Sequence, residues 1–197
     1  MRKVLFISIL LFLVGCTTTY PPMTEYRVAL KKSVKQPQSS CREKRLKVSQ
    51  VFLRSSLMSK EMKYVVGEYK EFSYTQSQWA EDPNKLLSDI LVQNLKESDI
   101  FASVVSYKSF SSANYTLESS VEDFTQYYSS DEKSSYVRVA MSFTLIATDK
   151  AEIVDTFRVV KQIDTKEPNA KSGVEALNVA LNSILGELDG WIAKSCK

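Results

Sequence analysis

Residues 62 to 95 read MKYVVGEYKEFSYTQSQWAEDPNKLLSDILVQNL, and the period of their apolar positions changes midway. In the first half, apolar and polar residues alternate on both sides of Gly67-Glu68, which predicts a β-hairpin over residues 60 to 77. Asp82 and Pro83 then predict the N-cap and first position of a helix. Apolar side chains fall on one face of that helix: Leu86, Leu87, Ile90, Leu91 and Leu95. We therefore expect the helix to cover a sheet.

Strand-like patterns lie on both sides of this segment. Tyr26, Val28 and Leu30 alternate as in a short first strand, and further strands are expected within residues 45–54, 102–108, 115–124, 137–145 and 153–163. A closing helix is predicted from a capping box between Ser172 and Glu175. This order predicts an α+β fold: a single two-layer domain whose antiparallel-rich mixed sheet is covered on one face by two helices. The other face, or an edge, is left for binding.

The amino end has the composition of an export signal. Two basic residues precede an apolar run from residue 4 to residue 14, and Gly15 and Cys16 follow. A helix of this run would span roughly 17 Å, which is short of the roughly 30 Å hydrocarbon core of a membrane. We therefore interpret residues 1–15 as a secretory signal peptide rather than a transmembrane helix.

The tetrapeptide Leu13-Val14-Gly15-Cys16 resembles the lipobox of bacterial lipoproteins. The resemblance implies cleavage before Cys16 and acylation of its thiol and its new amino group. Each buried methylene of such chains contributes about 0.8 kcal/mol, so two or three chains hold a protein on a membrane. Thr17 replaces the Asp that retains many lipoproteins at the inner membrane, which favours the inner leaflet of the outer membrane, facing the periplasm. The alternative is an ordinary signal with a chance cysteine.

Composition limits what the mature chain can do. Removing 15 of the 197 residues leaves 182, with 24 basic and 23 acidic side chains, so no charge footprint for nucleic acid is present. The chain has no histidine, which removes the commonest general base and metal ligand. No glycine-rich phosphate loop occurs. We therefore expect no enzyme activity, no catalytic residues, no cofactor and no metal site. The expected divisions are the signal (1–15), a lipidated tether with a short strand (16–43) and the α+β domain (44–197).

Cys41 and Cys196 are the two remaining cysteines, and an even pair in an exported chain is expected to form a disulfide. Such a bridge would close a ring of about 156 residues, to which the chain-entropy model assigns roughly 5 kcal/mol. It would fasten the last helix to the start of the domain. Two free thiols, or a metal site made from them, are the alternatives.

Residues 62 to 105 resemble the ABC-type transport auxiliary lipoproteins of the PqiC/YmbA type. The matching positions are Cys16, Tyr26, Val28, Leu30, Tyr64, Tyr74, Trp79, Ala80, Glu81, Pro83, Leu86, Leu87, Leu91, Leu95, Phe101 and Val104. The match is strongest at Trp79–Pro83 and weak after residue 110, and the two cysteines and the Ser-rich loops depart from the pattern. The resemblance implies an auxiliary subunit of an intermembrane phospholipid transport system, with an MCE-domain protein and an ABC permease and ATPase as partners.

Four residues are candidates for partner binding: Trp79 and Glu81 at the helix start, and Tyr127 and Tyr128 at a hairpin end. Trp79 would equally serve packing beneath the helix. Besides the transporter subunit, two other functions stay open. A periplasmic carrier would hold phospholipid in an apolar cavity of several hundred Å³, and a structural envelope lipoprotein would bind neither lipid nor transporter. A homo-oligomer is compatible with all three.

Overall fold

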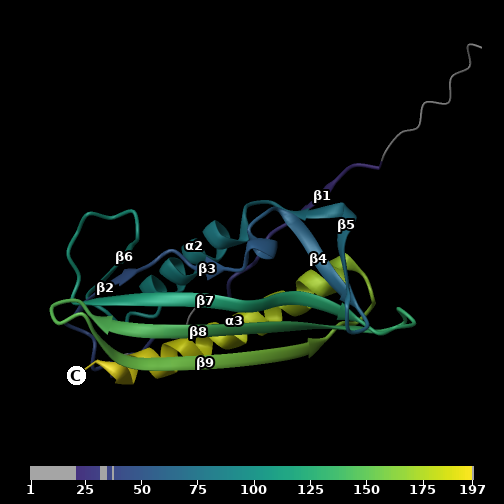
Figure 1. Cartoon of the computed structure of the whole chain (residues 1–197). Helices are drawn as coiled ribbons and strands as arrows, with labels where there is room; N and C mark the ends of the chain where they lie inside the picture. Colours follow the sequence, from purple (N-terminus) through teal and green to yellow (C-terminus); the bar gives the residue numbers. More distant parts are fainter. Residues whose placement is uncertain (1–20, 32–34, 37, 197) are drawn as a thin grey trace, which may run out of the picture.

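The computed structural model describes residues 21–31, 35–36 and 38–196, so the predicted signal peptide and Cys16 lie outside the described residues. Figure 1 shows the elements. In chain order they are β1 (Thr24–Tyr26), β2 (Arg45–Val48), β3 (Phe52–Leu53), the 3₁₀ turn η2 (Ser55–Leu57), β4 (Glu61–Val66), β5 (Lys70–Trp79), α2 (Pro83–Glu97), β6 (Ser103–Ser106), β7 (Tyr115–Tyr128), β8 (Ser135–Ala147), β9 (Glu152–Asp164) and α3 (Ala170–Ser195).

The sheet is built around β7. On one side β7 pairs along its whole length with antiparallel β8, and β8 pairs with antiparallel β9. On its other side β7 pairs in succession with β2, β3 and β4, all parallel to it. Beyond these lie β6 next to β2, β5 antiparallel to β4, and β1 next to β5. The predicted antiparallel-rich mixed sheet in one α+β domain is therefore confirmed.

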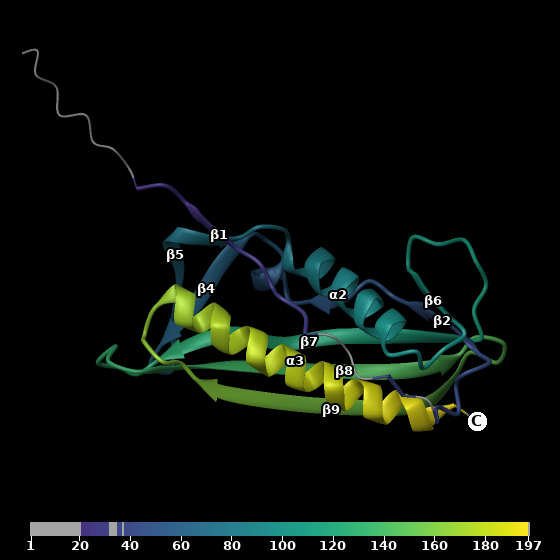
Figure 2. The same cartoon turned by 180° about the vertical axis from the view of Figure 1, so that it is seen from behind.

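Both helices lie behind the sheet in the view of Figure 1 and in front of it in Figure 2. The buried stripe of α3 packs on β8 and β9, and α2 packs on β2 and β6. The side-chain amide of Asn94 on α2 donates to Asp189 on α3 at 2.7 Å, and this buried bond joins the two helices. The prediction of two helices on one face is confirmed. Among the described residues, no helix is both long and apolar enough to cross a bilayer.

Both helix starts differ from their predicted capping. The predicted capping box at Ser172 is wrong, because α3 begins at Ala170 and its N-cap is Asn169. The Asn169 side chain accepts a hydrogen bond from the Ser172 backbone N–H at 2.9 Å, so Ser172 lies inside the first turn. Asp82 is the N-cap of α2 and Pro83 follows it as predicted, yet the Asp82 side chain makes no capping bond.

The predicted first strand is also displaced. β1 is Thr24–Tyr26, whereas Val28 and Leu30 pack against the core without a strand partner. The described residues that connect β1 to β2 form what we call the N-terminal strap. The strap follows α3: the Ala29 N–H donates to Asn178 at 2.6 Å, and the Asn182 amide donates to the Ala29 carbonyl at 3.0 Å.

Cys41 ends the strap in a disulfide with Cys196, directly after α3, with a Cα–Cα distance of 5.1 Å. Both cysteines are buried, and the Ser40 N–H donates to the Ala193 carbonyl at 2.9 Å beside them. The disulfide therefore fastens the carboxyl end of α3 to the chain just before β2.

Candidate docking surface on the open sheet face

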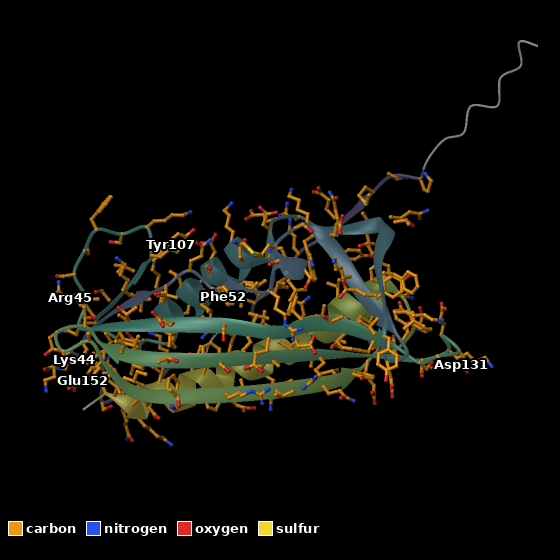
Figure 3. The ribbon with its side chains drawn as sticks, in the orientation of Figure 1. Lys44, Arg45, Phe52, Tyr107, Asp131 and Glu152 are labelled. Carbon is orange, nitrogen blue, oxygen red and sulfur yellow. A yellow bond between two sulfur atoms is a disulfide. The ribbon has the colours of Figure 1, made fainter. Side chains whose placement is uncertain are left out.

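None of the described helices covers the face of β7, β8 and β9 that points away from α3, as Figures 1 and 3 show. We call it the open face. The register places Tyr127 beside Tyr136, and Ser142 beside Arg158, on this face. One edge of β9 pairs with β8, and no strand among the described residues pairs with its other edge. The open face and this edge form a continuous surface that a partner could contact.

A β-bulge in β7 gathers charge on the open face. Val121 pairs with Met141 and Asp123 pairs with Ala140, so Glu122 is an extra residue in the ladder. The contacts of Glu122 and Asp123 show that both carboxylates face the open side. A regular strand would have turned one of them towards the helices. Bulges commonly re-aim side chains at functional surfaces in this way.

Glu122 lies at the centre of this group. Its carboxylate accepts hydrogen bonds from Arg158 Nη2 at 2.6 Å and Arg158 Nε at 3.0 Å, and from Ser142 Oγ at 2.5 Å. The hydrogen bonds from Arg158 and, to a smaller extent, from Ser142 lower the pKa of Glu122. The bond between Arg158 and Glu122 also raises the pKa of Arg158. Arg54 donates to the Glu122 carbonyl. The carboxylate is therefore held ionised and in a fixed position.

Asp123 forms a second group next to the first. It is buried, accepts from the Tyr127 hydroxyl at 2.8 Å, and pairs with Arg138 at 3.4 Å. Burial and then the bond to Asp123 raise the pKa of Tyr127 to about 12. The Tyr127 ring stacks on Tyr136 with centroids 5.3 Å apart. The aromatic pair thus covers a buried carboxylate.

An exposed aromatic ring borders these charged groups. Phe52 on β3 is 72% exposed, and Figure 3 shows it above β7. It lines a shallow cavity of about 370 Å³ together with polar residues of β7 and β8, among them Glu118 and Ser142. Paired charges beside an exposed phenylalanine are features of protein-binding surfaces, where aromatic residues and arginine are enriched.

The structure does not bring the four candidate partner-binding residues together. Trp79 is buried, and its ring lies 5.5 Å from that of Phe124. Glu81 is exposed at the start of α2 and pairs with Lys85 at 3.0 Å. Tyr127 faces the open side, whereas its neighbour Tyr128 is buried on the helix side. A docking role for these four residues stays a prediction, and the burial of Trp79 and Tyr128 makes packing their evident role in this structure.

Tyr128 belongs to a buried cluster that the sequence analysis did not anticipate. Its hydroxyl lies 2.6 Å from that of Tyr74, which donates to the Gln126 side chain at 2.9 Å. Burial raises the pKa of both tyrosines, so both remain protonated. Gln126 in turn donates to Ser135 Oγ at 2.9 Å and to the Asn169 carbonyl at 3.2 Å. This cluster joins the β4–β5 hairpin to β7, β8 and the start of α3.

The charged groups of the open face were missed for a local reason. Glu122-Asp123 has the sequence of a strand end, but it lies inside β7. A signal was present, because the apolar positions change from odd numbers up to Val121 to even numbers from Phe124 onward. A shift of one position within a single strand is what a bulge produces.

Comparisons with known proteins agree with this fold. A family model described as ABC-type transport auxiliary lipoprotein component matches residues 28–193. The crystal structure of protein XCC0632 from Xanthomonas campestris is similar, with a TM-score of 0.76 and 17% identity over 85% of this chain and 93% of that chain. An uncharacterized protein of known structure gives a TM-score of 0.67 and 16% identity over 87% of this chain and 99% of that chain. A comparison with curated proteins found no match.

At these identities the two solved structures establish the fold alone, and the family rests on the sequence model. That model covers the chain from Val28 in the strap to the last turn of α3. The chain belongs to the family of ABC-type transport auxiliary lipoprotein components.

Proposed function

We propose that this chain is a lipid-anchored periplasmic subunit of an ABC-type system that moves phospholipid between the inner and outer membranes. In this proposal Cys16 anchors the protein in the inner leaflet of the outer membrane, and the folded domain binds an MCE-domain protein. The family match over residues 28–193 carries the proposal, because it makes the chain an auxiliary component of an ABC-type transporter. The permease and ATPase would supply the energy elsewhere in the complex.

The open face is the part of the domain best suited to bind this partner. Two of its acidic groups are already paired, Glu122 with Arg158 and Asp123 with Arg138, so docking over these pairs would not bury an unpaired charge. Beside them, the unpaired edge of β9 offers backbone N–H and C=O groups to a strand of the partner. Polar pairs give such a contact its specificity, and the Phe52 ring supplies apolar area.

The carrier alternative needs an enclosed apolar cavity of several hundred Å³. The enclosed space that lies between the sheet and the helices near Trp79 and Leu177 has a volume of about 10 Å³. The cavity of about 370 Å³ beside Phe52 opens to solvent, and its other lining residues are polar. These volumes support the subunit proposal over a carrier that stores lipid inside the domain.

Co-purification tests the docking proposal. The lipidated protein and the MCE-domain protein of the same system are expressed together, and the complex is captured on a tag placed on the MCE component. Glu122→Ala with Arg158→Ala should reduce recovery of the lipoprotein. Lys63→Ala with Glu71→Ala removes an ion pair of the same kind on the β4–β5 hairpin and should not. Glu81→Ala with Lys85→Ala tests the candidate docking residue on α2. Reduced recovery with the α2 variant alone would place the docking site on that helix. Full recovery with both the Glu122–Arg158 variant and the α2 variant would refute docking through either group of charges.

The anchor requires a separate test. Labelled palmitate should enter the wild-type chain and should not enter a Cys16→Ala variant. Membrane fractionation on a density gradient should then place the labelled protein with the outer membrane. Label in both proteins, or in neither, would refute the anchor, whereas labelled protein in the inner-membrane fraction would refute the sorting alone.

A further inference from the structure

Residues 107–113 form a loop that projects from the body between β6 and β7, seen in Figures 1 and 2 in teal. Phe110 in this loop is fully exposed. Lys108 lies beside it, with its ammonium 5.5 Å from the centroid of the Tyr107 ring. The loop reads YKSFSSA and contains no acidic residue. It therefore presents aromatic rings and a positive charge to whatever lies above it.

The base of the loop is held firmly. Asn114 accepts from the Arg45 N–H at 2.9 Å, and the Asn114 N–H donates to the Arg45 carbonyl at 2.9 Å. The Lys47 ammonium donates to the Ser109 carbonyl at 3.0 Å, within the loop itself. The exposure of Phe110 is thus a property of a supported loop. Single exposed apolar side chains are common on protein surfaces, so exposure alone does not assign a role to Phe110. Its position on the domain is the further evidence.

The loop projects on the side from which the amino-terminal chain leaves the body. In Figures 1 and 2 the loop and the described chain before β1 both rise above α2. Cys16 precedes Pro21 by five residues, which span at most about 18 Å when extended. An acyl chain on Cys16 would therefore bring the bilayer close to this side of the domain.

We propose that the Phe110 loop rests on the bilayer surface as a second, reversible contact besides the lipid anchor. The proposal rests on the predicted acylation of Cys16, and it is independent of which protein the open face binds. Aromatic rings at the level of the headgroups with neighbouring basic side chains are typical of interfacial contacts. Arg45, Lys47 and Lys108 supply the charge that anionic headgroups attract. The absence of any carboxylate in the loop avoids repulsion from them.

The two contacts would fix how the domain lies. The loop precedes the start of β7, whereas β4, which leads through β5 to β1, pairs with the end of β7. The two ends of β7, a strand of 14 residues, are about 43 Å apart. The anchor and the loop would therefore hold β7 parallel to the membrane. The edge of β9, on the opposite side in Figure 1, would face away from the bilayer and towards a partner.

Tryptophan fluorescence tests the contact in the full-length lipidated protein. Phe110→Trp is reconstituted into vesicles of phosphatidylethanolamine and phosphatidylglycerol, with or without brominated acyl chains. Tyr69→Trp is the matched control, because Tyr69 is 89% exposed in the β4–β5 turn. This turn lies beside the β7–β8 hairpin, since the Gly67 N–H donates to the Tyr128 carbonyl, and is therefore away from the side where the amino-terminal chain leaves the domain. Wild-type protein gives the background from Trp79 and Trp191. Bromine should quench roughly half or more of the fluorescence added at position 110, and little of that added at position 69.

Flotation of the wild-type protein with the vesicles reads the anchor separately. Protein that floats but shows no quenching at position 110, or equal quenching at both positions, would overturn the loop contact while leaving the anchor intact. A fluorescence change at position 110 that occurs only after an MCE-domain protein is added would assign the loop to a protein partner, which also overturns the proposal. Protein that does not float would refute the anchor and the loop contact with it.

Discussion

Gly173, in the second turn of α3, lies against the Gln126 side chain, and the close fit gives a prediction of defined size. A Cβ atom at position 173 would lie 1.8 Å from Gln126 Oε1 and 2.5 Å from its side-chain carbon. Gln126 is buried, so a new position for its side chain would have to be found among neighbouring groups. We therefore expect Gly173→Ala to expel this side chain from its position and to break its hydrogen bonds with Tyr74, Ser135 and Asn169.

The size of the effect follows from two opposing contributions. Three hydrogen bonds at about 1 kcal/mol each give a loss of about 3 kcal/mol in the free energy of unfolding. Alanine in place of glycine inside a helix gains about 1 kcal/mol. The net expectation for Gly173→Ala is a destabilisation of about 2 kcal/mol.

Urea unfolding of the disulfide-bonded protein, followed by tryptophan fluorescence and circular dichroism, measures this loss. Gly186→Ala and Gly190→Ala are matched controls in the same helix, because a Cβ at either position meets no atom within 4 Å. Each control should stabilise the protein by up to about 1 kcal/mol. Destabilisation by the controls would show that glycine is needed in α3 for another reason.

A double-mutant cycle with Gln126→Ala isolates the contact. Once the glutamine side chain is removed, Gly173→Ala should stabilise the protein by about 1 kcal/mol, like the controls. The expected coupling between the two positions is then about 3 kcal/mol, at the upper end for residues in contact. Equal destabilisation by Gly173→Ala in both backgrounds would refute the reasoning.

Three further predictions concern other parts of the domain. Replacing Cys41 and Cys196 by serine should lower the free energy of unfolding by about 2–5 kcal/mol, and equal urea stabilities of the variant and the oxidised wild type would contradict it. The lowered pKa of Glu122, caused by Arg158, means that its stabilising effect is present above about pH 4.5 and is lost as the pH falls below that value. Thermal unfolding of Glu122→Gln should therefore depend less on pH between about pH 5 and pH 3 than that of the wild type, and parallel curves would count against it. Ser119→Ala should raise the free energy of unfolding by about 1 kcal/mol, since the Ser119 hydroxyl is buried without a hydrogen-bond partner among the described residues; a decrease would indicate a buried water.

Local periodicity predicted those elements that bury one side against a single neighbouring layer and expose the other. Residues 136 to 147 alternate because α3 covers one side of β8, whereas the other side is left uncovered by the helices that the structure describes. The apolar stripes of both helices have a similar origin, because each helix buries one face against the sheet. In each case the pattern depends on a single contact face, so a short window of sequence contains it.

The order of the strands could not be predicted in this way. β7 pairs on one side with β2, β3 and β4 in turn, and these pairings join segments more than fifty residues apart. The shift of apolar positions from Val48 to Val51 indicates an irregularity but does not identify the partner strand. The cap of α3 was ambiguous for a related reason, since Asn169 and Ser172 are both good capping residues. The structure selects Asn169, whose side chain accepts from Ser172.

If the chain is anchored at its amino end, the disulfide lies where it would limit the effect of tension from the anchor. Tension on Pro21 would first load the three residue pairs of β1 with β5, and then the hydrogen bonds of the strap to Asn178 and Asn182. Such bonds can break one after another, which would peel the strap from α3. Peeling must stop at Cys41, because its covalent bond to Cys196 carries the load directly to the end of α3. Tension at the anchor would then reach β8 and β9 only through their packing against α3.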